Sequence, residues 1–128
     1  MASVAMVCAL NEYWQGSIIE WDPDWIKRGA AARVRAELGA DIIKTNYTGE
    51  VDAFKEDKGV SCAVVIAGGP QMDSPRELLQ MVRDSIDAGG RGVSIGRNIF
   101  QAKDPTDLVR KIARVVHEGY DVDEAIRV

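Results

Sequence analysis

The sequence has few of the residues that mark metal-binding, nucleic-acid-binding or membrane proteins. Its 128 residues include two cysteines and one histidine, and no Cys-x-x-Cys or Cys/His cluster predicts a metal site. The net charge of −4 gives no basic surface for nucleic acid. No apolar run approaches the roughly 20 residues of a membrane span, and no basic and apolar leader indicates secretion. We therefore expect a cytoplasmic protein without metal, cofactor, nucleic-acid or membrane partners.

The residues that are present are typical of one globular domain, which we expect to cover residues 1–128. The chain is 46% hydrophobic and 28% charged, enough for a core of useful size. Cys8 and Cys62 both lie in apolar runs, so we expect buried free thiols rather than a disulfide.

Apolar runs of strand length alternate with amphipathic segments of helix length. The predicted strands cover residues 3–10, 41–46, 61–67 and 92–95, and residues 11–21 are predicted to form a loop. Predicted helices cover residues 22–38, 51–58, 74–88, 104–118 and 121–128, with a single turn at 98–101, and Asp-Pro or Ser-Pro opens three of them. This alternation predicts an α/β fold with a parallel sheet, and the core strand that begins at residue 3 suggests that the chain starts within a larger fold.

A lysine lies inside the second predicted strand. Strand alternation puts Lys44 and Asn46 on one face and Ile43 on the other. If Ile43 faces the helices, Lys44 points to the inner face, where loss of hydration can lower the amine pKa toward roughly 7 to 8 and make it a nucleophile for carbonyls. The alternative is a structural ion pair with Asp41 or Glu50, and the spacing alone does not decide between the two.

Glycine turns directly follow the last two predicted strands. Gly68 and Gly69 follow one strand, and Gly96 and Arg97 follow the next. Small residues let backbone N–H groups approach an anion, and the guanidinium adds a bidentate donor. Each turn alone is weak evidence, because left-handed turns need glycine anyway. The pair favours a phosphate site, with the turn at 98–101 as the short extra helix beside it.

Two tyrosines are candidate proton donors near the lysine. Tyr13 lies in the first loop and Tyr47 follows the lysine-bearing strand. The alternative for each is an amphipathic side chain at the rim of the fold, and the sequence favours that alternative for both.

Three motifs in this order resemble a known family of enzymes. The stretches GADIIKTNYTG, VVIAGGP and DAGGRGVSIGRNIFQ, followed by VVHEG, resemble class I aldolases of the archaeal-type fructose-bisphosphate aldolase group. Relatives of that group include the aminodideoxyheptulosonate synthases and the bacterial sugar-phosphate and autoinducer thiolases. The resemblance covers roughly residues 23–128. It implies a (β/α)8 barrel about twice as long as this chain, which corresponds to strands five to eight.

The resemblance also implies roles for individual residues. Lys44 is similar to the Schiff-base lysine on strand six, and Gly68, Gly69, Gly96 and Arg97 resemble the phosphate-binding turns. A class I aldolase of this kind forms an iminium between lysine and the carbonyl of a phosphorylated sugar or ketone, and the iminium accepts electrons during C–C cleavage or formation. The phosphate anchor holds the reacting carbon at the lysine.

The chain departs from the family pattern at three places. The acidic residue of the first barrel strand belongs to the half that this chain lacks. The tyrosine that ends strand five has only Tyr13 nearby as a substitute, and Gln71 stands where a lysine is common. A non-catalytic phosphate-binding half-barrel, or an isomerase that uses Lys44 electrostatically, are therefore the alternative functions.

Half a barrel leaves two strand edges and an inner face open. Two copies closing one barrel, a complementary N-terminal half, or an open sheet that dimerises through its inner face would each cover them. All three predict that the chain is not a monomer.

Overall fold

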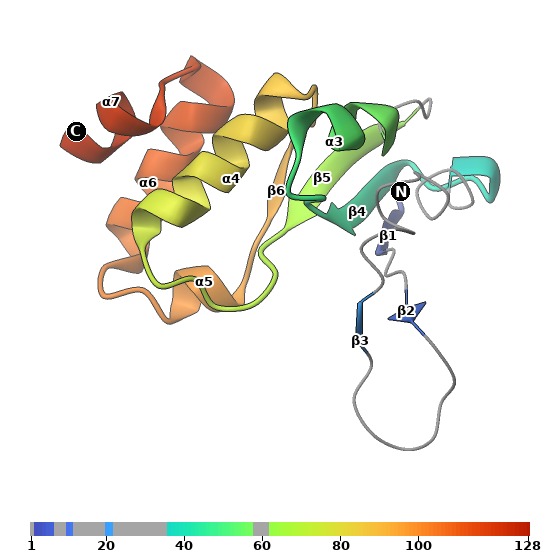
Figure 1. Cartoon of the computed structure of the whole chain (residues 1–128), viewed down its shortest axis with the longest axis horizontal. Coiled ribbons are helices and arrows are strands. Elements are labelled where there is room, and N and C mark those ends of the chain that lie inside the picture. The colour runs from blue at the N-terminus through green and yellow to red at the C-terminus, as the bar shows by residue number, and fades with distance from the viewer. Residues whose placement is uncertain (1, 7–9, 12–19, 22–35, 58–61) are drawn as a thin grey trace.

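The computed structural model describes residues 2–6, 10–11, 20–21, 36–57 and 62–128. Its main sheet contains β1 (Val4–Met6), β4 (Ile42–Asn46), β5 (Ala63–Ala67) and β6 (Gly92–Ser94), all parallel and adjacent in this order (Figure 1). Each strand thus lies beside the strand of this sheet that precedes it in the chain. A sector of a parallel βα barrel requires this arrangement.

The register of the strands brings their carboxyl ends to one edge. Asn46 of β4 is opposite Ala67 of β5, and Ala67 is opposite Ser94 of β6. The loops that follow these three strands therefore begin at the same level of the sheet. In parallel α/β folds this edge carries the functional residues.

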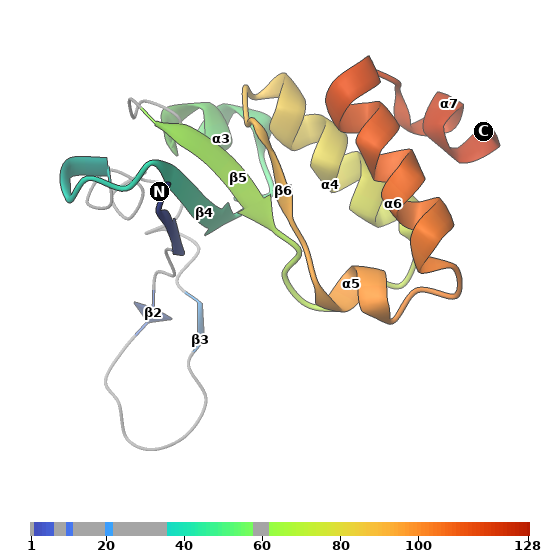
Figure 2. The ribbon, with the colours of Figure 1, turned by 180° about the vertical axis from the view of Figure 1, so that it is seen from behind.

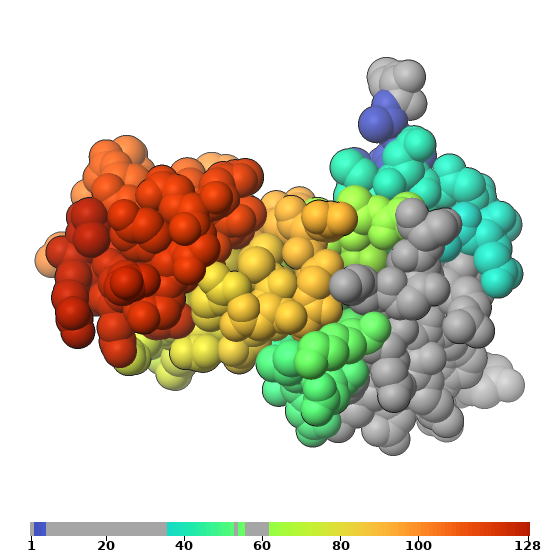
Figure 3. All heavy atoms as spheres, turned by 90° about the horizontal axis from the view of Figure 1, so that it is seen from above, coloured from blue at the N-terminus to red at the C-terminus, as the bar shows by residue number. Residues whose placement is uncertain are grey.

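Helices pack on one face of the sheet and against one another. α3 (Val51–Asp57) and α4 (Pro75–Asp87) lie over the strands, and α6 (Pro105–Ala113), its π-helical continuation η1 (Arg114–Glu118) and α7 (Val122–Arg127) pack against α4. Figure 1 shows α3 and α4 in front of the strands, and Figure 2 shows the same strands from the opposite side. From above, the C-terminal helices form one mass at one end of the molecule (Figure 3).

The helices begin where the sequence predicts capping residues. Ser74 accepts a hydrogen bond from the Glu77 N–H at 3.3 Å, and Asp104 accepts one from the Asp107 N–H at 2.9 Å. A proline follows each cap, at the first helical position, where a backbone N–H would have no acceptor within the helix. The predicted starts of α4 and α6 are confirmed.

The core lies between the sheet and the helices. Its fully buried side chains come from alternate positions of β4 and β5 and from the inner faces of α3, α4 and η1, as expected for half-buried strands and amphipathic helices. The largest of them are Phe54, Ile43, Ile66, Leu78, Leu79, Val64, Val82 and Val115.

Parts of the structure differ from the sequence predictions. β2 (Leu10–Asn11) and β3 (Glu20–Trp21) pair antiparallel where the sequence predicts the end of a strand at residue 10 and a loop at 11–21. Two-residue strands are too short to show any alternation in the sequence. α5 (Arg97–Phe100) begins one residue before the predicted turn. Most of the predicted helix 22–38 lies outside the described residues, although Gly39, its predicted end, has the left-handed φ of 87°.

Candidate active site

Lys44 lies in the middle of β4, on the face opposite the helices. Its neighbours Ile43 and Thr45 are 0% and 3% exposed, because both point into the helix-covered core. Alternation therefore turns Lys44 to the other face, where it is half-buried and lines a cavity of about 300 Å³. The sequence prediction of the direction of this side chain is confirmed.

The alternative of a structural ion pair for Lys44 finds no support. The carboxylate of Asp41 accepts hydrogen bonds from Ser3 instead, from the backbone N–H at 2.7 Å and from Oγ at 2.9 Å. The backbone hydrogen bond from Ser3, and then that from its hydroxyl, lowers the pKa of Asp41 below its usual value of 3.8. Among the residues that the structure describes, none forms an ion pair with Lys44.

One cavity brings together the predicted lysine and both predicted glycine turns. Gly68 and Gly69 follow β5, and Gly96 and Arg97 follow β6; all four line the cavity that contains Lys44. They meet because β4, β5 and β6 are adjacent and end in register. Residues from three separate motifs thus share one concave surface.

Glycine is needed in the first turn for two physical reasons. Gly69 has a φ of 64°, in the left-handed region that side chains with a Cβ avoid. A Cβ on Gly68 would lie 2.7 Å from Ile95 Cγ2, which is closer than carbon atoms pack. The first glycine therefore permits close packing against the segment after β6, and the second permits the turn itself.

The cavity is suited to an anionic, carbonyl-bearing ligand. Lys44 and Arg97 contribute positive charge, and no carboxylate is among the lining residues that the structure describes. Ser94 lies two strands across and two residues along from Lys44, so their Cα atoms are about 12 Å apart by standard strand spacings. A lysine side chain and a short phosphorylated carbon chain together span that distance.

The structure adds lining residues that sequence reasoning did not select. Asn46 and Ser94 line the cavity, as do Ala67 and Pro70. The Oδ1 atom of Asn46 is buried and has no hydrogen-bond partner among the described residues. The sequence contains one signal for Asn46: it lies two residues after Lys44 on the same predicted strand, so both side chains are expected on one face.

The structure does not bring the predicted tyrosines to the lysine. Tyr47 packs its ring against Phe54 on the helix side, with the ring centroids 5.5 Å apart, and it is not a lining residue of the Lys44 cavity. Burial, followed by the charges of Asp84 and Glu50, raises the pKa of the Tyr47 phenol above 10.0. Tyr13 lies outside the described residues, so its proposed role stays a prediction.

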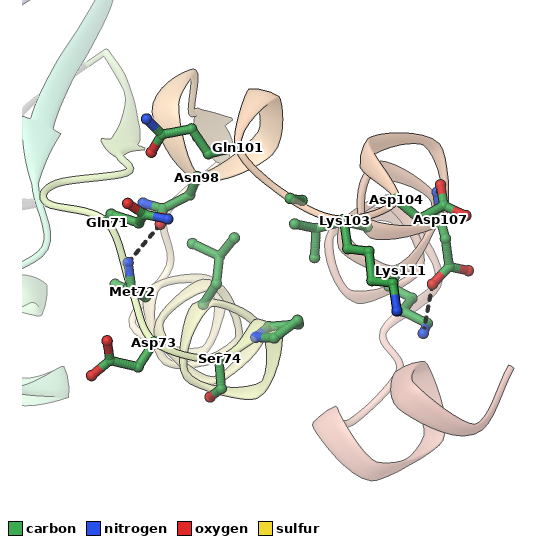
Figure 4. A pocket seen from close by; sticks show the side chains of 14 residues that line it. Gln71, Met72, Asp73, Ser74, Asn98, Gln101, Lys103, Asp104, Asp107 and Lys111 are labelled. Atoms are coloured by element: carbon green, nitrogen blue, oxygen red, sulfur yellow. Dashed lines mark hydrogen bonds and ion pairs between the residues drawn. The ribbon is translucent and has the colours of Figure 1, made fainter.

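A second, larger cavity lies beside the loop after β5 and the start of α6. Its volume is about 360 Å³, and Figure 4 shows the side chains that line it. Asp107 and Lys111 form an ion pair there at 2.7 Å, so these two charges are already partnered. Because Lys44 and Arg97 do not line this cavity, we assign the candidate active site to the smaller one.

The described part of the chain shows no candidate metal site. It contains no group of three or more His, Cys, Asp or Glu side chains placed to hold a metal ion. None of its helices is long and apolar enough to cross a membrane.

Comparisons with known proteins identify what this arrangement is similar to. Residues 1–102 match the family described as DeoC/LacD family aldolase. The chain is 40% identical over 97 residues to an uncharacterized aldolase of Saccharolobus solfataricus, covering 75% of this chain and 36% of the relative. It is 40% identical over 114 residues to a class 1 fructose-bisphosphate aldolase of Halobacterium salinarum, covering 88% of this chain and 42% of the relative.

A solved structure shows the same arrangement of elements. The structure of a Schiff-base-forming fructose-1,6-bisphosphate aldolase matches with a TM-score of 0.77 and 28% identity, over 91% of this chain and 46% of that one. The chain thus spans less than half the length of these proteins, and the prediction of an α/β partial barrel is confirmed. By sequence and by fold, the chain belongs to the DeoC/LacD family of aldolases.

Proposed function

We propose that this chain provides the lysine-bearing half of a class I aldolase site that acts on a phosphorylated sugar or ketone. The observation that carries the proposal is the single cavity lined by Lys44 and by the glycine turns after β5 and β6. Lysine supplies the nucleophile for a carbonyl, and the turns with Arg97 supply the donors for a phosphate. The Schiff-base-forming aldolase of similar fold supports the assignment.

The proposed chemistry begins with attack of the neutral Lys44 Nζ on the carbonyl carbon of the ligand. The resulting carbinolamine loses water and forms an iminium between Nζ and that carbon. A base then removes the proton of the hydroxyl on the β carbon, and the bond between the α and β carbons breaks. Its electron pair moves toward the iminium nitrogen and gives an enamine, and the β carbon departs as an aldehyde. Protonation of the enamine carbon and addition of water then release the second product and restore the amine.

The phosphate turns would contribute by positioning. An anion held by Gly68, Gly69, Gly96 and Arg97 places the carbonyl of a short chain within reach of Lys44, which makes the attack effectively intramolecular. The proton transfers need a further acid or base. We assign that role to Tyr13 or to residues of a complementary half-barrel.

We also propose that the barrel is completed by a second chain. β1 and β6 form the two edges of the main sheet, and each has one neighbouring strand among the described residues. Unpaired edge N–H and C=O groups favour pairing with another chain. Light scattering at micromolar concentration should give a mass above that of one 14.0 kDa chain, and a clean monomer would contradict this proposal.

Borohydride reduction in the presence of a keto-phosphate such as dihydroxyacetone phosphate tests the imine. The expected result is an irreversible mass increase on the peptide that contains Lys44. Lys44→Arg should abolish the adduct, because arginine keeps the charge but forms no imine. Lys103→Arg is the matched control, since Lys103 is exposed and does not line the cavity that contains Lys44; it should retain the adduct. An unmodified Lys44 at saturating keto-phosphate would refute the proposal.

A non-catalytic phosphate-binding module is the second candidate. It is favoured by the lack of a carboxylate among the described lining residues of the Lys44 cavity, because aldol chemistry needs proton transfer. This candidate predicts saturable phosphate binding without any borohydride adduct. Titration with inorganic phosphate alongside the reduction experiment separates the two functions.

A further inference from the structure

Asn98 connects the two glycine turns of the candidate site. It is the second residue of α5, it is 7% exposed, and it directly follows Arg97 in the chain. Its side-chain Nδ2 donates hydrogen bonds to the carbonyl oxygens of Gly68 and Pro70, both at 2.9 Å. Its Oδ1 accepts a hydrogen bond from the Met72 N–H at 2.7 Å (Figure 4). One side chain thus binds three backbone groups of the turn after β5.

The identity of these partners determines how the amide is oriented. Two carbonyl oxygens need the two N–H donors of the NH2 group, and one backbone N–H needs the carbonyl oxygen of the side chain. The reversed orientation would place Oδ1 against two other oxygens. Aspartate has no N–H donor at this position, and alanine has neither a donor nor an acceptor.

Packing leaves the turn little freedom relative to Asn98. A Cβ placed on Gly68 would lie 3.3 Å from Asn98 Nδ2 and 2.7 Å from Ile95 Cγ2. The first residue of the turn is therefore enclosed by the segment that leads into α5. The second turn is joined to α5 as well: the Gly96 carbonyl accepts hydrogen bonds from the backbone N–H groups of Ile99 at 2.9 Å and Phe100 at 3.0 Å.

We propose that Asn98 is a positioning residue that sets the spacing of the two turns for the phosphate of the ligand. This inference rests on the proposed function, because it concerns the anion half of the same cavity. Backbone donors bind an anion well when their positions are fixed before the ligand arrives. Asn98 fixes them by binding Gly68 and Pro70 while belonging to the helix that begins at Arg97. Asn98 lines the second, larger cavity and not the cavity that contains Lys44.

The test compares Asn98→Ala with Gln101→Ala in the full chain. Gln101 is also an amide residue, but it is exposed and lies at the end of α5. Isothermal titration with inorganic phosphate should show affinity about tenfold weaker for Asn98→Ala, as expected when a few hydrogen bonds that hold a site are lost. Gln101→Ala should bind within twofold of the unaltered chain.

A second measurement separates positioning from a general loss of structure. Borohydride trapping at Lys44 is compared for dihydroxyacetone phosphate and for dihydroxyacetone, which has the same carbonyl but no phosphate. Asn98→Ala should raise the concentration of the phosphorylated ketone needed for half-trapping by about tenfold. Trapping by dihydroxyacetone should stay within twofold, and a merely structural role would weaken both.

The outcomes distinguish this inference from the proposed function. Equal phosphate affinity in Asn98→Ala and the unaltered chain would overturn the positioning role and leave the function intact. Absence of phosphate binding by the unaltered chain would instead remove the anion site itself. If Asn98→Ala does not fold, hydrogen exchange at the Met72 amide of the unaltered chain decides: protection that increases with phosphate is expected, and exchange at the unprotected rate overturns the inference.

Discussion

Replacing Gly68 with alanine tests whether the first glycine turn is as closely packed as the structure shows. The added Cβ would meet Ile95 Cγ2 at 2.7 Å, a contact that side chains do not make without movement. Ile95 is β-branched, so its χ1 rotation is restricted. Gly68 is buried, and the turn itself must therefore shift to relieve the contact. Overpacking of this kind costs about 1–3 kcal/mol, and we expect Gly68→Ala to lower the free energy of unfolding by that amount.

A second glycine of the same site provides the control. Gly96 has a φ of −111°, and a Cβ there would come no closer than 3.9 Å to Phe100 Cε2. Gly96→Ala should therefore change the free energy of unfolding by less than about 0.5 kcal/mol. Urea denaturation followed by circular dichroism measures both variants under the same conditions. Equal stability of the two variants would refute the packing argument.

The remaining predictions concern β4 and its neighbours. Ile43→Ala should lower the free energy of unfolding by about 2–5 kcal/mol in urea denaturation, because Ile43 is 0% exposed, whereas Ile42→Ala on the opposite face should cost less than half of that. The hydrogen bonds from Ser3 lower the pKa of Asp41, so they stabilise the fold above pH 3.8 and are lost below it. The stability difference between Asp41→Asn and the unaltered chain should thus shrink between pH 7 and pH 3; a constant difference would exclude this linkage. Tyr47→Phe should leave borohydride trapping within twofold of the unaltered chain, since its ring lies on the helix side, and a tenfold loss would restore it as a proton donor.

Sequence reasoning located the lysine and both glycine turns because local rules govern them. Strand alternation determines the direction of Lys44 once Ile43 is assigned to the core, and glycines directly after strands mark the carboxyl edge of a parallel sheet. That these residues share one cavity depends on the order of the strands, which the pattern of alternating strands and helices also predicts.

Other features depend on contacts that no local pattern contains. The binding of Asn98 to the turn after β5 joins residues 26 to 30 positions apart in the chain. The packing of Tyr47 against Phe54 depends on how α3 returns to the sheet. Both are products of tertiary structure, and a single sequence gives no signal for either of them.

The most direct test of the account is a crystal structure of the chain after borohydride reduction with dihydroxyacetone phosphate. We predict continuous electron density from Lys44 Nζ into the ligand, with the phosphate bound between the Gly68–Gly69 turn and Arg97. Density for the ligand at another lysine, or a phosphate bound away from these turns, would contradict it.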